Sequence, residues 1–169
     1  MGKRRITKYT LRKSTEHLFY EAQMFYVTLV FLRKSMCQIE KNILLDAFAI
    51  HARNLFNFFY PKQKNIKPDD MSVIDFIDKP KFFNTNKTKE RDLIFIIKNA
   101  NKQVAHLTYA RNRYNQDTKR WDPIDIGKKI RKTLNAFYNS LPSSYKGWQH
   151  IRNLKELLIN YRLFEDGMQ

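Results

Sequence analysis

The chain of 169 residues contains one cysteine, four glycines and five prolines. A single cysteine excludes a disulfide scaffold and a cysteine-based zinc site. So few glycines and prolines exclude a loop-rich β-sandwich, a collagen-like chain and a flexible linker protein. The most apolar stretch, residues 24–32, is far shorter than the roughly 20 residues that span a bilayer. No secretory signal follows the basic start, so we expect a cytoplasmic protein without a membrane partner.

Acidic residues are also scarce, with 16 Asp and Glu against 32 Lys and Arg, and the formal net charge is +16. Such a charge attracts polyanions, and RNA, DNA, an anionic membrane surface and an acidic partner protein are all candidates. The alternative is a compositional bias, because the chain is rich in Lys, Asn, Ile and Phe. The cations concentrate in three clusters. The first is an N-terminal arm with Lys3, Arg4, Arg5, Lys8, Arg12 and Lys13. The second contains Arg111, Arg113, Lys119 and Arg120, and the third contains Lys128, Lys129, Arg131 and Lys132.

Apolar residues recur three or four positions apart along almost the whole chain, which is the spacing of amphipathic helices. The hydrophobic fraction of 43% is enough for a core. There is no alternating strand pattern and no internal repeat. We therefore expect an all-α, single-domain helical bundle of about five to six helices over residues 14–169, preceded by a basic N-terminal arm at 1–13.

Capping residues and prolines set the expected helix ends. Ser14 is a candidate cap for the first helix, Pro61 ends the second, and Thr88 begins the third. Asp122 followed by Pro123 is a strong helix start. Residues 61–88 read as an irregular connection with a short helix within 69–77. The expected long helices cover residues 14–36, 39–60, 88–108 and 123–141, and a last one starts near 144.

Few motifs of known chemistry are present. The glycines lie too far apart for a phosphate-binding loop. The four histidines fall on four different expected helices, so a metal site would have to be assembled by the fold. We therefore expect neither a metal ion nor a cofactor.

Three polar residues interrupt the apolar sequence of the second expected helix. Asp46 and Arg53 are seven residues apart and lie on the same side, whereas His51 lies on a more apolar side. In one interpretation, His51 and Arg53 contact a nucleic acid. In the other, Asp46 and Arg53 pair with each other and His51 forms a hydrogen bond inside the bundle.

The third expected helix carries a polar face made of Asn99, Lys102, Gln103 and His106. An imidazole moves protons near neutral pH, and a lysine with an amide can hold a phosphate. The alternative is a solvated helix face with a histidine near its C-terminus, where the helix dipole favours the charged form.

Residues 100–109, with the sequence ANKQVAHLTY, resemble the signature helix of HEPN domains, and residues 46–55 resemble the long helix that precedes it. HEPN domains are small all-helical bundles whose motif is Arg, a polar residue, three further residues and then His. His106 matches the motif histidine. Asn101 stands where the family has arginine, and Lys102 occupies the polar position.

The resemblance implies an RNA-directed protein that binds RNA or nucleotide and acts as a metal-independent endoribonuclease of a toxin–antitoxin or phage-defence type. In such a protein His106 is the general acid and base, and Lys102 and Asn101 hold the scissile phosphate. Paired subunits in the family imply a homodimer. The residues assigned to nucleic-acid binding are Arg53, His51, Asn99, Arg111, Arg113, Lys119 and Arg120.

A second interpretation is a non-catalytic helical interaction module that dimerises and binds an acidic partner protein. The aromatic content of 14% and the long connection at 61–88 are consistent with an interface of this kind. The two interpretations differ in whether His106 is needed for activity.

Overall fold

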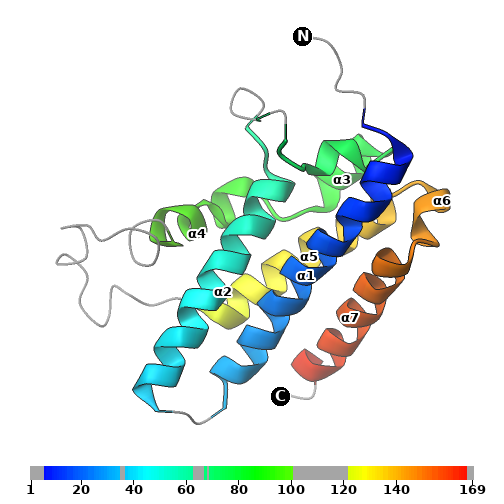
Figure 1. Ribbon diagram of the computed structural model, residues 1–169. Helices are drawn as coiled ribbons and strands as arrows, with labels where there is room; N and C mark the ends of the chain where they lie inside the picture. The colour runs from blue at the N-terminus through cyan, green and yellow to red at the C-terminus, as the bar shows by residue number, and fades with distance from the viewer. Residues whose placement is uncertain (1–5, 35–36, 63–66, 68, 101–121, 167–169) are drawn as a thin grey trace.

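The computed structural model describes residues 6–34, 37–62, 67, 69–100 and 122–166. These residues contain seven α-helices and no strand, which confirms the all-α prediction. The four long helices α1 (Lys8–Leu32), α2 (Gln38–Phe59), α5 (Pro123–Ser140) and α7 (Gln149–Asp166) lie side by side (Figure 1). Helix α1 packs against α2, α5 and α7 and thus forms the centre of the bundle.

Helix α1 begins at Lys8, so the expected start at Ser14 is wrong. The N-cap is Thr7, whose hydroxyl oxygen accepts a hydrogen bond from the backbone nitrogen of Thr10 at 3.1 Å. Ser14 lies within the helix and donates to the carbonyl of Thr10. Leu11 is buried in the core, so the buried stripe extends beyond Ser14 towards the N-terminus. Residues 8–13 therefore belong to the first helix.

Helix α2 matches the expected second helix to within one residue at each end. Its first turn is held by Glu40, whose carboxylate accepts from the backbone nitrogen of Cys37 at 2.9 Å. Pro61 follows the C-cap Tyr60, as expected for a residue that cannot continue a helix.

The connection after α2 contains a 3-10 helix, η2 (Val73–Asp75), and a short helix, α3 (Pro80–Asn86). Ser72 precedes η2, and its backbone nitrogen donates to the Asp75 carboxylate at 3.0 Å. Val73 and Phe76 are buried in the core. This part of the connection is therefore built into the bundle through its own apolar side chains.

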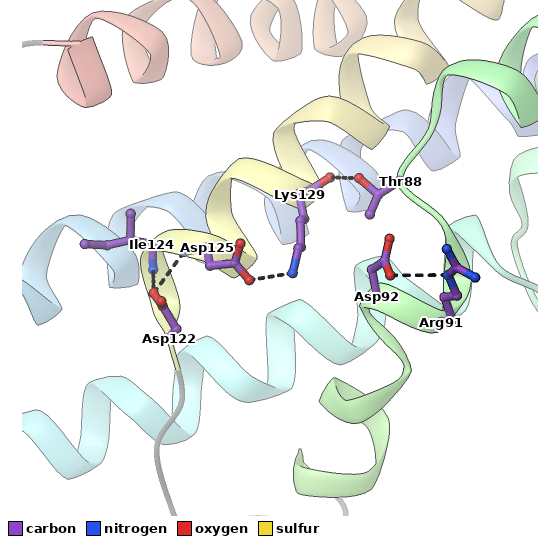
Figure 2. Close-up of polar contacts among 7 residues, drawn as sticks. All are labelled: Thr88, Arg91, Asp92, Asp122, Ile124, Asp125 and Lys129. Carbon is purple, nitrogen blue, oxygen red and sulfur yellow. Dashed lines mark hydrogen bonds and ion pairs between the residues drawn. The ribbon is translucent and has the colours of Figure 1, made fainter.

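The third long helix does not start at Thr88. A 3-10 helix, η3 (Glu90–Asp92), comes first, and α4 (Ile94–Asn99) follows. The Thr88 hydroxyl donates to the carbonyl of Lys129 on α5 at 2.7 Å, so it serves a tertiary contact rather than a helix cap (Figure 2). The remaining residues of the expected helix, 101–108, lie outside the described residues.

The expected start of α5 is confirmed. One carboxylate oxygen of Asp122 accepts from the backbone nitrogens of Ile124 and Asp125, at 3.1 and 3.0 Å (Figure 2). The expected last helix is divided into α6 (Ser143–Lys146) and α7, with Gly147 at the end of α6. Trp148, between the two, is buried and stacks on Tyr145.

Aromatic rings fill the end of the core formed by α2, α5 and η2. Phe137 has no exposed surface, and its ring meets those of Phe58, Phe59 and Phe76 at tilted angles, with centroids 5.6 to 6.1 Å apart. Such edge-to-face contacts add to the stabilisation from burial. The connection, α2 and α5 are thus joined in one core.

A small buried polar network joins the same elements. The Tyr60 hydroxyl at the end of α2 donates to the carbonyl of Thr88 at 2.6 Å. The hydroxyl oxygen of Thr133 on α5 accepts from the backbone nitrogen of Thr88 at 3.3 Å. Burial raises the pKa of Tyr60 to about 12, because the charged phenolate is disfavoured away from water. These bonds hold the chain before α4 against α5.

Candidate nucleic-acid interface

Most of the residues predicted to act on RNA lie outside the described part of the chain. Asn99 is the last residue of α4, and its side chain also lies outside what the structure describes. The other predicted residues outside the described ranges are Asn101, Lys102 and His106 of the motif, together with Arg111, Arg113, Lys119 and Arg120.

His51 is on α2 and is directed at α1. Its Nδ1 lies 2.7 Å from a carboxylate oxygen of Glu21, and the amide of Asn54 donates to the same oxygen at 3.2 Å. The edge of the Tyr20 ring packs on the imidazole, with ring centroids 5.8 Å apart. His51 is 9% exposed. It thus forms the hydrogen bond inside the bundle that one of the two interpretations expected.

Arg53 does not share the environment of His51. Residues two apart on a helix point to different faces, and Arg53 is half-buried. Asp46, one of the polar residues of this helix, is exposed. The structure therefore does not gather His51 and Arg53 into one site.

A positively charged surface lies on α5, and we call it the α5 basic groove. Two shallow hollows, of about 380 and 480 Å³, share a row of residues on this helix. Helix α3 borders one hollow and α7 borders the other. The charged and amide side chains of the groove are Lys128, Arg131, Lys132, Asn135 and Asn139 of α5, Asn86 of α3 and Lys155 of α7.

The spacing of these residues follows the α-helix. Arg131, Asn135 and Asn139 are each four residues apart, as are Lys128 and Lys132. Such residues share a face and follow one another at about 6 Å along the helix axis. The groove therefore presents a row of polar and charged groups along one side of α5.

The charge of the three lysines of the groove is not neutralised by any carboxylate of the described residues. No carboxylate of the described residues lines either hollow or pairs with Lys128, Lys132 or Lys155. An ion pair on this helix joins Lys129 to Asp125 at 2.6 Å, on the side that faces Thr88 (Figure 2). Desolvated or paired cations would be poor phosphate ligands, and these three lysines are exposed.

An aromatic ring lies on the floor of the hollow between α5 and α7. Two lysine ammonium groups, those of Lys146 and Lys155, lie over the Tyr138 ring at 5.2 and 5.8 Å from its centroid. Cation–π contacts of this kind hold long side chains in place without neutralising them. Tyr138 therefore positions positive charge at the edge of the groove.

Only part of this surface can be predicted from the sequence. The cluster at 128–132 is visible as a run of cations, but Asn135 and Asn139 become part of the site only through the helical repeat. Lys155 joins it because α7 packs beside α5, which no local pattern indicates.

The described residues contain neither a metal-binding cluster nor a membrane-spanning helix. No group of three or more His, Cys, Asp or Glu side chains there is arranged to hold a metal ion. None of the described helices combines the length and the apolar character that crossing a membrane requires.

Comparison with known proteins adds no relative. The chain matches no protein-family model, no curated protein and no solved structure.

Proposed function

We propose that this protein binds RNA through the α5 basic groove. The observation that carries the proposal is the row of exposed lysines on α5 and α7 that no carboxylate of the described residues neutralises. Lysine and arginine on one face form the electrostatic footprint of a nucleic-acid-binding protein. The net charge of +16 draws a polyanion to the protein from a distance.

The surroundings of α5 favour RNA over duplex DNA. A recognition helix must enter the major groove of DNA, which is wide enough for one helix. Helix α5 packs against α3 and α7, so it cannot enter that groove alone. RNA helices offer a wide, shallow minor groove lined by 2′-hydroxyls, and single strands offer exposed bases. The amides of Asn135 and Asn139 can both donate to and accept from such groups.

Catalysis is the second element of the proposal, and it comes from the resemblance to HEPN domains. His106 takes the proton of the 2′-hydroxyl as that oxygen bonds to phosphorus. It returns a proton to the 5′-oxygen, which leaves as its own bond to phosphorus breaks, and Lys102 with Asn101 holds the phosphate. Lysine is a point charge rather than a planar fork, so the phosphate would be held less rigidly than by the arginine of the family.

The binding proposal is tested by comparing two double variants that remove the same charge. Lys128→Gln with Lys132→Gln alters the groove, and Lys34→Gln with Lys41→Gln alters exposed lysines near the turn between α1 and α2. We expect only the groove variant to lose affinity for a labelled 20-nucleotide RNA, by roughly tenfold or more. The slope of its log affinity against log salt concentration should also become shallower, because up to about two phosphate contacts are lost. Equal losses in both variants would show that only overall charge matters.

Cleavage is tested in the same preparations. The wild type and a His106→Ala variant are incubated in EDTA with an end-labelled structured RNA, and a DNA of the same sequence is added as competitor. We expect metal-independent cleavage by the wild type alone and stronger competition by RNA than by DNA. Intact RNA that is bound equally by both proteins would leave a binding protein and remove the catalytic role of His106.

A protein-binding module is the second candidate function, favoured by exposed apolar side chains on α1 and α2. Ile39 and Ile43 on α2 are 71% and 63% exposed, and Phe31 on α1 is 39% exposed. Ile39 and Ile43 are four residues apart and share one face of α2, and adjacent exposed apolar groups mark interaction sites. Light scattering across a range of concentrations tests self-association, and Ile43→Asp should abolish any dimer that uses this surface.

A further inference from the structure

A second site candidate lies away from the α5 basic groove, in a cavity of about 570 Å³. Its walls come from α1, the C-terminal half of α2, the segment at 70–72 and α4. This volume falls in the range of small-molecule sites. The cavity shares no lining residue with the groove among the described residues. The cavity is therefore a separate candidate binding site.

One polar group of the cavity wall is the carboxylate of Glu21. One of its oxygens, Oε2, accepts from His51 at 2.7 Å and from Asn54 at 3.2 Å. The two donors come from α2 and fix the orientation of the carboxylate. The side chain of Glu21 is 25% exposed and lines the cavity. No hydrogen bond from a described residue reaches its other oxygen, Oε1.

A fixed carboxylate selects a ligand that presents donors. Oε1 has two lone pairs and can accept two adjacent N–H groups. Among the four RNA bases, only guanine has two donors side by side on its pairing edge, the N1–H and the N2 amino group. Adenine and cytosine place a ring lone pair beside their amino group, and uracil flanks its single N–H with carbonyls. Each of those bases would set an acceptor against the carboxylate.

The net charge of the protein indicates that such a ligand is anionic as a whole. At +16, the protein attracts phosphate esters and repels free amines and guanidinium compounds. The exposed side chains of Lys62, His17 and Asp70 also line the cavity. A nucleotide combines a phosphate for Lys62 and His17 with a base edge for Glu21.

The remaining walls suit a flat, weakly polar ring. Half-buried Met71, Ile94 and Ile97 contribute apolar surface that the faces of a base can cover. Asn57 is exposed and lies one turn after Asn54 on α2, so its amide can donate to the O6 carbonyl of guanine. We propose that this cavity binds a guanine base, with Glu21 accepting from N1–H and the N2 amino group.

The base can come from a free guanine nucleotide or from a guanosine within RNA. In the second case the inference rests on the proposed RNA binding, and the cavity would add base selectivity to a groove that reads the phosphate backbone. In the first case it stands independently of the groove.

The test measures the binding of GMP and AMP by calorimetry to the wild type, Glu21→Gln and Glu16→Gln. Glu16 is an exposed glutamate of the same helix that does not line the cavity, so both variants remove one negative charge. We expect the wild type and Glu16→Gln to prefer GMP by roughly tenfold or more, the value of a hydrogen bond to a charged group. Glu21→Gln should lose this preference without losing AMP binding, because general attraction to anions rises when a carboxylate is removed.

A second variant covers the possibility that Glu21→Gln disturbs the packing of α1 on α2. Asn57→Asp leaves the contacts of Glu21 intact and sets a negative charge where the O6 carbonyl would lie. It should weaken GMP binding and leave thermal unfolding unchanged. The inference would be overturned if the wild type bound GMP and AMP with equal affinity, or bound neither, and also showed no preference for guanosine in RNA.

Two heptanucleotides, one with a single guanosine and one with adenosine in its place, separate the two sources. A preference for the guanosine RNA without a preference for GMP assigns the site to RNA, and the reverse assigns it to free nucleotide. If no RNA binds but GMP is preferred, the proposed function fails and this inference stands. If RNA binds at the groove without any preference for guanine, the inference fails and the proposed function stands.

Discussion

Replacing Thr133 by valine should lower the free energy of unfolding, mainly because it breaks the buried hydrogen-bond network around Thr88. Thr133 has no exposed surface, and valine has nearly the same shape as threonine. The change removes the oxygen that accepts from the backbone nitrogen of Thr88 and that lies 3.3 Å from the Tyr60 hydroxyl. The nitrogen of Thr88 is then buried without an acceptor, which costs about 2 kcal/mol of unfolding free energy. For a chain of this size, that loss lowers Tm by roughly 4–8 °C.

Thr28→Val is the matched control for this measurement. Thr28 is also a buried threonine in a long helix, at 3% exposure. Its hydroxyl donates only to carbonyls of its own helix, those of Met24 and Phe25. Those carbonyls keep their backbone partners after the substitution, so only the net value of a hydrogen bond, about 1 kcal/mol or less, should be lost.

Urea unfolding followed by far-ultraviolet circular dichroism measures both losses. The physical difference is whether the hydroxyl joins two parts of the chain or only serves its own helix. Equal losses in the two variants would refute the reasoning, because burial alone would then account for both.

Three further changes test other parts of the structure. Burial raises the pKa of Tyr60 from its usual 10 to about 12, so the folded state disfavours the phenolate. The free energy of unfolding is therefore unaffected by this group below pH 10 and falls by about 3 kcal/mol as the pH rises towards 12. Urea unfolding at pH 9 to 11 should show a slope that Tyr60→Phe reduces, and parallel curves would contradict the assignment. Asp122→Ala removes the cap of α5 and should lower the free energy of unfolding by about 1 kcal/mol. Hydrogen exchange at the first turn of α5 should become faster than in the wild type, and an unchanged rate would argue against the cap. Gly127→Ala places a Cβ 2.6 Å from the Cδ2 of Leu29, so overpacking should outweigh the gain in helix propensity and lower the free energy of unfolding by about 1 kcal/mol. In the control Gly147→Ala, the new Cβ meets nothing within 4 Å and should not destabilise the protein. Tm values that change alike in both variants would count against the close approach of α1 and α5.

The features that the sequence predicts well are those set by neighbouring residues. The helical period of the apolar side chains predicts the all-α class and the extent of α2. The start of α5 follows from Asp122 and Pro123, because an N-cap carboxylate and a first-turn proline act within three residues of each other. The clustering of Lys128, Arg131 and Lys132 is likewise visible without a structure.

The errors occur where two local signals are equivalent. Thr7 and Ser14 are both good caps, and the choice of Thr7 goes with the burial of Leu11 in the core, which only the packed bundle provides. Thr88 has the local character of a cap, but its hydroxyl donates to Lys129, 41 residues away. A hydroxyl forms the bond that the whole fold makes available, and local preference is too weak to decide it.

Both candidate sites also depend on contacts between distant segments. Glu21 and His51 are 30 residues apart and meet because α1 packs on α2. Lys155 completes the α5 basic groove because α7 packs beside α5. The sequence alone determines which charges and hydrogen-bonding groups this protein has and which helices carry them, since these properties are local. Only the tertiary structure decides which of them face each other across a cavity or a groove, because helix packing brings together residues that no local pattern relates.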